Sequence, residues 1–274
     1  MAGSGNSRQG IAGTRPDRLQ LEHVDFPTAL KERRAARRLS QLELAVRTGT
    51  TQRHLSFIES GRSTPGREMV IRLAESLGLP LRERNELLLK AGYAPAYPET
   101  PLDSPGLAPV LDALTHILDA HMPYPAIVID RYGEIAAANA GLRILADGCA
   151  GHLRANAYRL ALHPDGMAPR IANFAEWAWH VLNAMAAELA RNPDERLAAL
   201  HTELSQYVPP ACLAPGHLGF AVPLELRTPH GELRLMTTIT SFATAVDVTI
   251  SELKLEAFLP ADQATAATLI RAAG

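Results

Sequence analysis

Apolar residues recur at helical spacing between residues 26 and 91, in five short segments that polar residues and glycines separate. Ser40 is placed to begin the second helix as its N-cap, with Glu43 completing a capping box. Gly49 ends that helix, because glycine adopts the left-handed backbone conformation at little cost. Thr51 caps the third helix. The pattern therefore predicts an all-α domain of five helices over residues 26–91.

The second half of the chain mixes two periodicities. Alternating strand-like stretches stand beside long helical ones, and turn residues separate them. The expected strands lie within 124–141, where a turn at 131–133 divides two of them, and at 218–228, 232–242 and 252–260; the expected helices are 110–121, 173–192, 193–207 and 261–273. Residues 110–274 are thus predicted to form an α+β domain, an antiparallel sheet with helices inserted between its strands.

Two further segments carry no such pattern. Residues 1–25 are rich in Gly, Ser, Arg and Gln, and are expected to form a disordered tail. Residues 92–109 contain five prolines, which exclude a helix interior and predict a linker between the domains.

The second and third segments have the composition of a helix-turn-helix. Two helices that cross steeply need a small residue at the crossing, which Ala45 supplies, and a glycine in the turn, which Gly49 supplies. Leu44, Leu55 and Ile58 are expected to form the shared core. In this motif the N-terminal side chains of the second helix enter the major groove of DNA.

Polar side chains stand where base contacts would be made. Gln52 can pair with adenine and Arg53 with guanine, each through two hydrogen bonds, and Ser56 lies nearby. Candidate phosphate contacts surround this helix. They are Arg38, Gln41, Arg62 and Arg67.

Charge is distributed unevenly along the chain. Residues 1–91 hold 16 Lys and Arg against 10 Asp and Glu, whereas the remainder holds 11 against 19, so the formal net charge of −2 hides a basic and an acidic half. This asymmetry favours a polyanionic partner for the N-terminal domain alone, although chance clustering gives the same counts.

Residues 29–80, with "LSQLELAVRTGTTQRHLSFIESGR" at their centre, resemble the XRE family of Cro- and lambda-repressor-like helix-turn-helix domains. The resemblance implies a lambda-repressor-like fold, with Gln41 on a phosphate and Thr51, Gln52 and Arg53 toward the groove. One position departs from the pattern: Thr50 follows the turn glycine, where the family usually has an aliphatic residue.

The C-terminal half shows no catalytic, metal or cofactor motif: HExxH, CxxC, a P-loop, GxSxG and GxGxxG are all absent. We therefore expect no enzyme, no metal and no cofactor. Its apolar helices and strands can instead enclose a pocket, although a plain core has the same periodicity. Aromatic, cationic and amide side chains of this half are the candidate pocket residues. They are Asn139, Arg159, His163, Arg170, Trp177 and Phe242.

Several stretches of this half, among them "YPAIVIDRYGEIAAANAG", "LHPDG" and "TSFATAVDVTISELKLEAFLPAD", resemble the MmyB-like regulators. Together with "GREMVIRLAE" and "LRERNELLLKAGYAPAY", the resemblance spans about residues 26–274. It implies a dimeric bacterial regulator whose PAS-like domain takes a small hydrophobic or fatty-acid-like molecule. Many members carry tryptophan where this chain has Gly133, a departure that is expected to widen or open the pocket.

The leading interpretation is a sequence-specific transcription regulator, a repressor that binds operator DNA as a homodimer under control of a small hydrophobic effector. Two alternatives remain: an enzyme in residues 92–274 tethered to DNA, and a ligand-independent repressor whose second domain only dimerises. No apolar run is long enough for a membrane span, the N-terminus lacks a secretory signal and there are two cysteines, so a cytoplasmic protein is expected.

Overall fold

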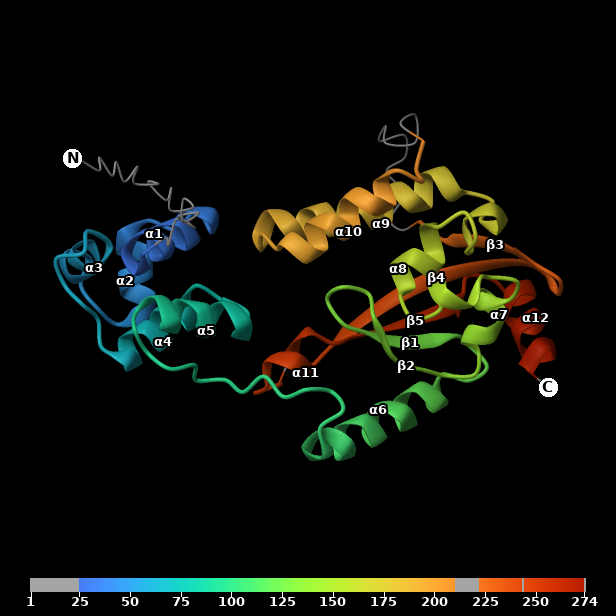
Figure 1. Cartoon of the computed structure of the whole chain (residues 1–274), viewed down its shortest axis with the longest axis horizontal. Helices are drawn as coiled ribbons and strands as arrows, with labels where there is room; N and C mark the ends of the chain where they lie inside the picture. The colour runs from blue at the N-terminus through green and yellow to red at the C-terminus, as the bar shows by residue number, and fades with distance from the viewer. Residues whose placement is uncertain (1–24, 210–221, 243, 274) are drawn as a thin grey trace, which may run out of the picture.

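The computed structural model describes residues 25–209, 222–242 and 244–273. The expected tail, apart from residue 25, and the first four residues of the expected strand 218–228 lie outside this part. Figure 1 shows an all-helical unit at one end of the molecule and an α+β unit at the other, joined by an extended segment.

The N-terminal unit has the five helices that the periodicity predicts. They are α1 (Phe26–Ala36), α2 (Gln41–Thr48), α3 (Gln52–Glu59), α4 (Arg67–Ser76) and α5 (Leu81–Lys90). The predicted capping box is formed: Ser40 Oγ accepts from the backbone N–H of Glu43, whose carboxylate accepts from the backbone N–H of Ser40. Gly49 ends α2 at φ 70°, and the apolar residues Leu44, Leu55 and Ile58 are completely buried.

A buried ion pair joins the first three helices. Arg34 on α1 donates from Nε and Nη2 to the two carboxylate oxygens of Glu59 on α3, over 2.6 and 2.9 Å. Gln41, the first residue of α2, donates from Nε2 to the same carboxylate over 2.8 Å. The Glu59 side chain is only 3% exposed. Although burial favours its neutral form, these hydrogen bonds lower the pKa of Glu59 below its ordinary value, so it is ionised at neutral pH.

The connection between the units is held against the helical domain at its start. Asn85 accepts from the backbone N–H groups of residues 96 and 97 through Oδ1, and donates from Nδ2 to the carbonyl of Tyr97. Tyr93 donates to the carbonyl of Pro65. Part of the expected linker is therefore packed, and its last residues enter a short 3-10 turn, η1 (Pro105–Leu107), and the helix α6 (Ala108–Ala120).

The C-terminal unit is built on an antiparallel five-stranded sheet in the order β2-β1-β5-β4-β3. Its strands are β1 (Ala126–Ile129), β2 (Ile135–Ala138), β3 (Leu224–Thr228), β4 (Gly231–Ser241) and β5 (Lys254–Pro260). Its other helices are α7 (Leu142–Ala146), α8 (Ala157–Leu162), α9 (Phe174–Arg191), α10 (Glu195–Ser205), α11 (Val248–Glu252) and α12 (Gln263–Ala273), with 3-10 turns η2 (Gly151–Leu153) and η3 (Ala168–Arg170). The predicted sheet with inserted helices is thus confirmed, whereas short helices such as α8 and α11 are not among the expected helices.

The sheet separates two apolar cores, as strand alternation requires. Ala126 and Val128 of β1 pack with α6 on one face, and Ile127 and Ile129 pack with α7 to α10 on the other. Figure 1 shows α6 on one side of the sheet and α9 with α10 on the opposite side.

Replacing Glu59 by Gln is expected to lower the free energy of unfolding of the N-terminal unit by about 3 kcal/mol, because Arg34 would keep its charge in a buried site without an oppositely charged partner. The measurement is urea-dependent amide exchange of α1 to α3. Glu86→Gln is the matched control, since Glu86 is 49% exposed beside Arg33 and its loss is expected to cost under about 1 kcal/mol. Equal effects of the two changes would contradict the assignment.

Candidate nucleic-acid interface and interior cavity

The N-terminus of α3 presents polar side chains to solvent. Thr51 is its N-cap, and its Oγ1 accepts from the backbone N–H of His54 over 3.1 Å. Gln52 and Arg53 follow and are exposed, whereas Leu55 and Ile58 turn toward the core. Ser56 is half-buried. One face of α3 therefore packs on the core, while the first turn of its opposite face is exposed and free for contact.

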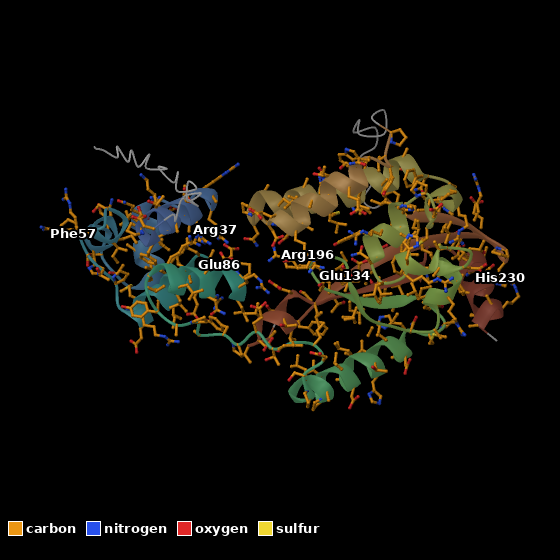
Figure 2. The ribbon with its side chains drawn as sticks, viewed as in Figure 1. Arg37, Phe57, Glu86, Glu134, Arg196 and His230 are labelled. Carbon is orange, nitrogen blue, oxygen red and sulfur yellow. The ribbon has the colours of Figure 1, made fainter. Side chains whose placement is uncertain are left out.

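The aromatic ring of Phe57 lies close to two arginines at this helix, Arg53 and Arg62. The guanidinium carbon of Arg53 lies 5.4 Å from the centroid of the Phe57 ring, and that of Arg62 lies 6.0 Å from it. Figure 2 shows Phe57 at the end of the molecule farthest from the sheet domain. Phe57 was missed by the sequence reasoning, although its position four residues after Arg53 on one helix was the available signal.

The predicted phosphate contacts lie around α3. Arg38, Arg62 and Arg67 are exposed, and Arg38 has a positive φ of 54°. Gln41 begins α2, and Arg67 begins α4. Because the Gln41 amide donates one hydrogen bond to Glu59, the buried ion pair also sets where this side chain lies.

The C-terminal domain has a partly open cavity of about 390 Å³ between the sheet and its helical cover. This volume lies within the range typical of small-molecule sites, roughly 300–1,000 Å³. Most of its wall is apolar and comes from β1, β4, β5 and α7 to α10. These side chains include Ile127, Leu142, Leu145, Leu160, Met167, Trp177, Val181, Met185, Leu197, Met236 and Phe258.

One end of the cavity is polar. Lys254 and Glu256 of β5 line it, as do Arg131 in the turn after β1 and the pair of Glu188 and Arg191 near the end of α9. The strand register places Lys254 beside Ile129, so Lys254 and Arg131 belong to the same end of the sheet. Glu188 accepts from Arg191 over 2.7 Å, which largely neutralises both charges.

Among the polar groups of this wall are the carboxyl of Glu256 and the hydroxyl of Tyr158, and neither makes a hydrogen bond with the residues described. Burial raises the pKa of each, against a weaker opposing effect of Lys254 on Glu256. Each shift is toward the protonated form, in which the group can donate a hydrogen bond to a molecule in the cavity.

The Tyr158 ring packs directly against the backbone of Gly133. The φ of Gly133 is 79°, and a Cβ atom at this position would overlap the Tyr158 ring. The space next to Gly133, where the resemblance led us to expect an opening, therefore holds the aromatic ring of another residue.

Of the six candidate pocket residues, Trp177 lines this cavity and the other five do not. Asn139 is buried, and its side chain bonds only backbone groups, accepting from residues 126 and 141 and donating to residues 118 and 124. Phe242 packs on the opposite face of the sheet, in the core under α6.

The three expected cations of the pocket edge have partners elsewhere. Arg159 forms two hydrogen bonds of 2.8 Å with Glu203, and Arg170 donates to the carbonyl of Leu145 over 2.6 Å. The His163 ring lies edge-on to that of Tyr207, with 4.7 Å between centroids. Helical spacing alone does not reveal these competing partners. The cations at the cavity are Arg131, Arg191 and Lys254 instead.

Within the described ranges, no group of three or more His, Cys, Asp or Glu is arranged to hold a metal ion. In the same ranges, no helix combines the length and apolar character that crossing a bilayer requires.

Comparison with known families agrees with this geometry. Residues 110–272 match the model of the MmyB-like transcription regulator ligand binding domain. Residues 30–84 match a helix-turn-helix model. No curated protein matches the chain.

Glu256→Gln is expected to raise the melting temperature at pH 7.5 and to leave it nearly unchanged near pH 4. Burial raises the pKa of Glu256 in the folded state above its ordinary value of 4.5. The folded protein therefore loses stability as the pH rises from this ordinary pKa through the higher pKa of the folded state. Glutamine does not titrate and escapes this loss. Calorimetric melting of both proteins across this pH range measures it, and a difference that does not change with pH would contradict the assignment.

Proposed function

Because this chain belongs to the MmyB-like transcription regulators, it is a DNA-binding transcription regulator with a ligand-binding domain, and we propose that it is a repressor acting as a homodimer on a pseudo-palindromic operator. The exposed first turn of α3, with Gln52 and Arg53 beside the Phe57 ring, carries the DNA-reading part of this proposal. Thr51 and Ser56 complete the base-reading set, and Arg38, Gln41, Arg62 and Arg67 contact phosphates.

The homodimer is supported by the size of the reading surface. One helix-turn-helix contacts only a few base pairs, so useful specificity requires two half-sites about one helical turn apart. A two-fold symmetric operator then mirrors the symmetry of the protein dimer.

The effector is a small hydrophobic or fatty-acid-like molecule held in the cavity of the C-terminal domain. The observation in favour is a cavity of about 390 Å³ with a largely apolar wall and polar groups at one end. Such a molecule regulates only if it binds the DNA-competent and DNA-incompetent states unequally. The cavity weighs against a second domain that only dimerises. The other alternative is an enzyme tethered to DNA. Among the described residues, no catalytic arrangement of side chains supports it.

The proposal is tested by titrating the protein into a labelled promoter fragment from beside its own gene and into a scrambled fragment, with mass spectrometry of molecules extracted from the purified protein. We expect a saturable complex on the promoter alone, and a lipid-like compound that is recovered unchanged and alters that affinity. Equal affinity for both fragments would contradict the regulator, and a chemically converted compound would favour the enzyme.

Arg53→Ala is expected to weaken binding to the operator by about 1–3 kcal/mol and to relax specificity at one base pair, because a bidentate contact to guanine is lost.

Arg62→Ala is expected to weaken binding to all sequences and to lower the salt slope by about one unit, the signature of a lost phosphate contact. Fluorescence anisotropy over a salt series measures both.

Arg227→Ala is the matched control, since Arg227 is an exposed arginine on β3 of the other domain and its loss removes the same charge. It is expected to leave affinity and slope unchanged. Uniform weakening by Arg53→Ala would make Arg53 a phosphate contact, and an unchanged slope for Arg62→Ala would remove Arg62 from the interface.

A further inference from the structure

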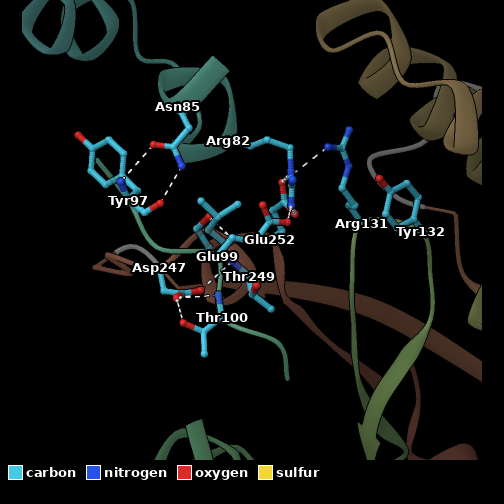
Figure 3. A network of polar contacts seen from close by, with 12 residues as sticks. Arg82, Asn85, Tyr97, Glu99, Thr100, Arg131, Tyr132, Asp247, Thr249 and Glu252 are labelled. Atoms are coloured by element: carbon cyan, nitrogen blue, oxygen red, sulfur yellow. Dashed lines mark hydrogen bonds and ion pairs between the residues drawn. The ribbon is translucent and has the colours of Figure 1, made fainter. Parts of the chain in front are cut away.

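The short helix α11 of the sheet domain contacts both the helical domain and the segment that connects the two domains. We call this set of contacts the seat. Asp247 caps its start, and its Oδ2 also accepts from the backbone N–H of Thr100 over 3.2 Å and from the Thr100 hydroxyl over 2.6 Å. The backbone N–H of Val248 donates to the carbonyl of Pro98 over 2.8 Å. Figure 3 shows Thr100 and Asp247 facing each other below α5. The connecting segment is therefore tied to the N-terminal end of α11.

The last residue of α11 binds the helical domain directly. Arg82, on α5, donates from Nε and Nη2 to the two carboxylate oxygens of Glu252, over 2.7 and 3.0 Å. Arg82 also donates to Glu99 of the connecting segment. A bidentate arrangement of this kind fixes orientation as well as distance. Glu252 thus sets how the DNA-binding domain sits on the ligand-binding domain.

Glu252 has a second cationic partner, and this partner is in the cavity wall. Nη1 of Arg131 lies 3.6 Å from Oε1 of Glu252, and its Nη2 lies 3.4 Å from Oδ2 of Asp194. Figure 3 shows Arg131 reaching from its turn toward Glu252 and Arg82. The Arg131 side chain is 13% exposed and lines the cavity.

Arg131 is held by charge but not by hydrogen bonds. Its guanidinium donates no hydrogen bond to any residue in the described part of the chain, although it has five N–H donors. An oxyanion in the cavity that accepts two of these hydrogen bonds would bind Arg131 more strongly than either long ion pair does. Lys254 lies at the same end, and burial shifts Glu256 and Tyr158 toward their protonated, hydrogen-bond-donating forms. The polar end of the cavity therefore suits a head group that accepts hydrogen bonds.

We propose that Arg131 is the positioning residue that couples the cavity to the DNA-binding domain: a carboxylate head in the cavity draws the guanidinium away from Glu252 and loosens the seat formed by α11. The proposal rests on the proposed function, because it assigns the regulation of that same cavity. Coupling of this kind is reciprocal, so loosening the seat also changes the affinity of the cavity.

The first test needs neither ligand nor DNA. Amide exchange of residues 99–100 and of α11 is measured by mass spectrometry in the full chain. Arg131→Gln is expected to speed this exchange by roughly threefold, because one of the two cations holding Glu252 is lost. Arg131→Lys is expected to restore much of the protection. Arg191→Gln is the matched control, since Arg191 also lines the cavity but is 71% exposed and pairs with Glu188.

A double variant separates coupling from simple destabilisation. If Arg131 acts through Glu252, then Arg131→Gln combined with Glu252→Gln is expected to exchange no faster than Glu252→Gln alone. Additive effects of the two changes would overturn the proposal, as would an effect of Arg191→Gln equal to that of Arg131→Gln.

The second test uses decanoate and 1-decanol as probes that share a chain but differ in the head group. Decanoate is expected to protect the amides around the cavity of the unaltered protein and to speed amide exchange of residues 99–100 and α11. The alcohol 1-decanol is expected to leave exchange in this seat unchanged. In Arg131→Gln neither probe is expected to change the seat. Cavity protection by decanoate without any change at the seat would overturn the coupling, and no protection by decanoate would overturn the carboxylate head.

Neither test depends on operator binding. A seat that fails to respond while promoter binding is retained would therefore remove the role of Arg131 and leave the proposed function standing.

Discussion

The position of one short helix constrains both halves of this molecule. Helix α11 ends at Glu252, which holds Arg82 of the DNA-binding domain, and β5 begins two residues later at Lys254, which lines the cavity. Strand β5 is also the central strand of the sheet, hydrogen-bonded to β1 on one side and β4 on the other. A displacement of the cavity wall near Lys254 therefore also moves the seat at Glu252, because two residues of extended chain cannot absorb the movement.

The DNA-binding unit, in contrast, is built to resist internal movement. The carboxylate of Glu59 receives hydrogen bonds from α1 and α2 while it belongs to α3, so the three helices share one buried anion. A buried charge with all its partners in place resists rearrangement, since separating any partner leaves an uncompensated charge. Regulation of this protein is thus expected to move the domain as a rigid body rather than to reshape its reading helix.

The sequence predicted local structure well and long-range contacts poorly, for a physical reason. Caps and turns such as Ser40, Gly49 and Thr51 depend on neighbours within a few residues, so their pattern is visible in the chain itself. The cavity is lined by residues from 127 to 258, and Arg159 and Arg170 were read as pocket cations because Glu203 and the Leu145 carbonyl are remote partners. Helix α11 escaped prediction because five residues are too few to show a helical period.

The nature of the contact between the domains decides whether a small molecule can control it. A large apolar interface would lock one arrangement, because its separation exposes apolar surface in proportion to its area. Here, among the described residues, Arg82, Thr100 and Val248 donate the hydrogen bonds of the seat, and partly exposed polar contacts contribute only about 1 kcal/mol each. That is comparable to the coupling free energy of typical allosteric systems, about 1–3 kcal/mol. A ligand that changes one ion pair can therefore shift the balance between arrangements of this chain.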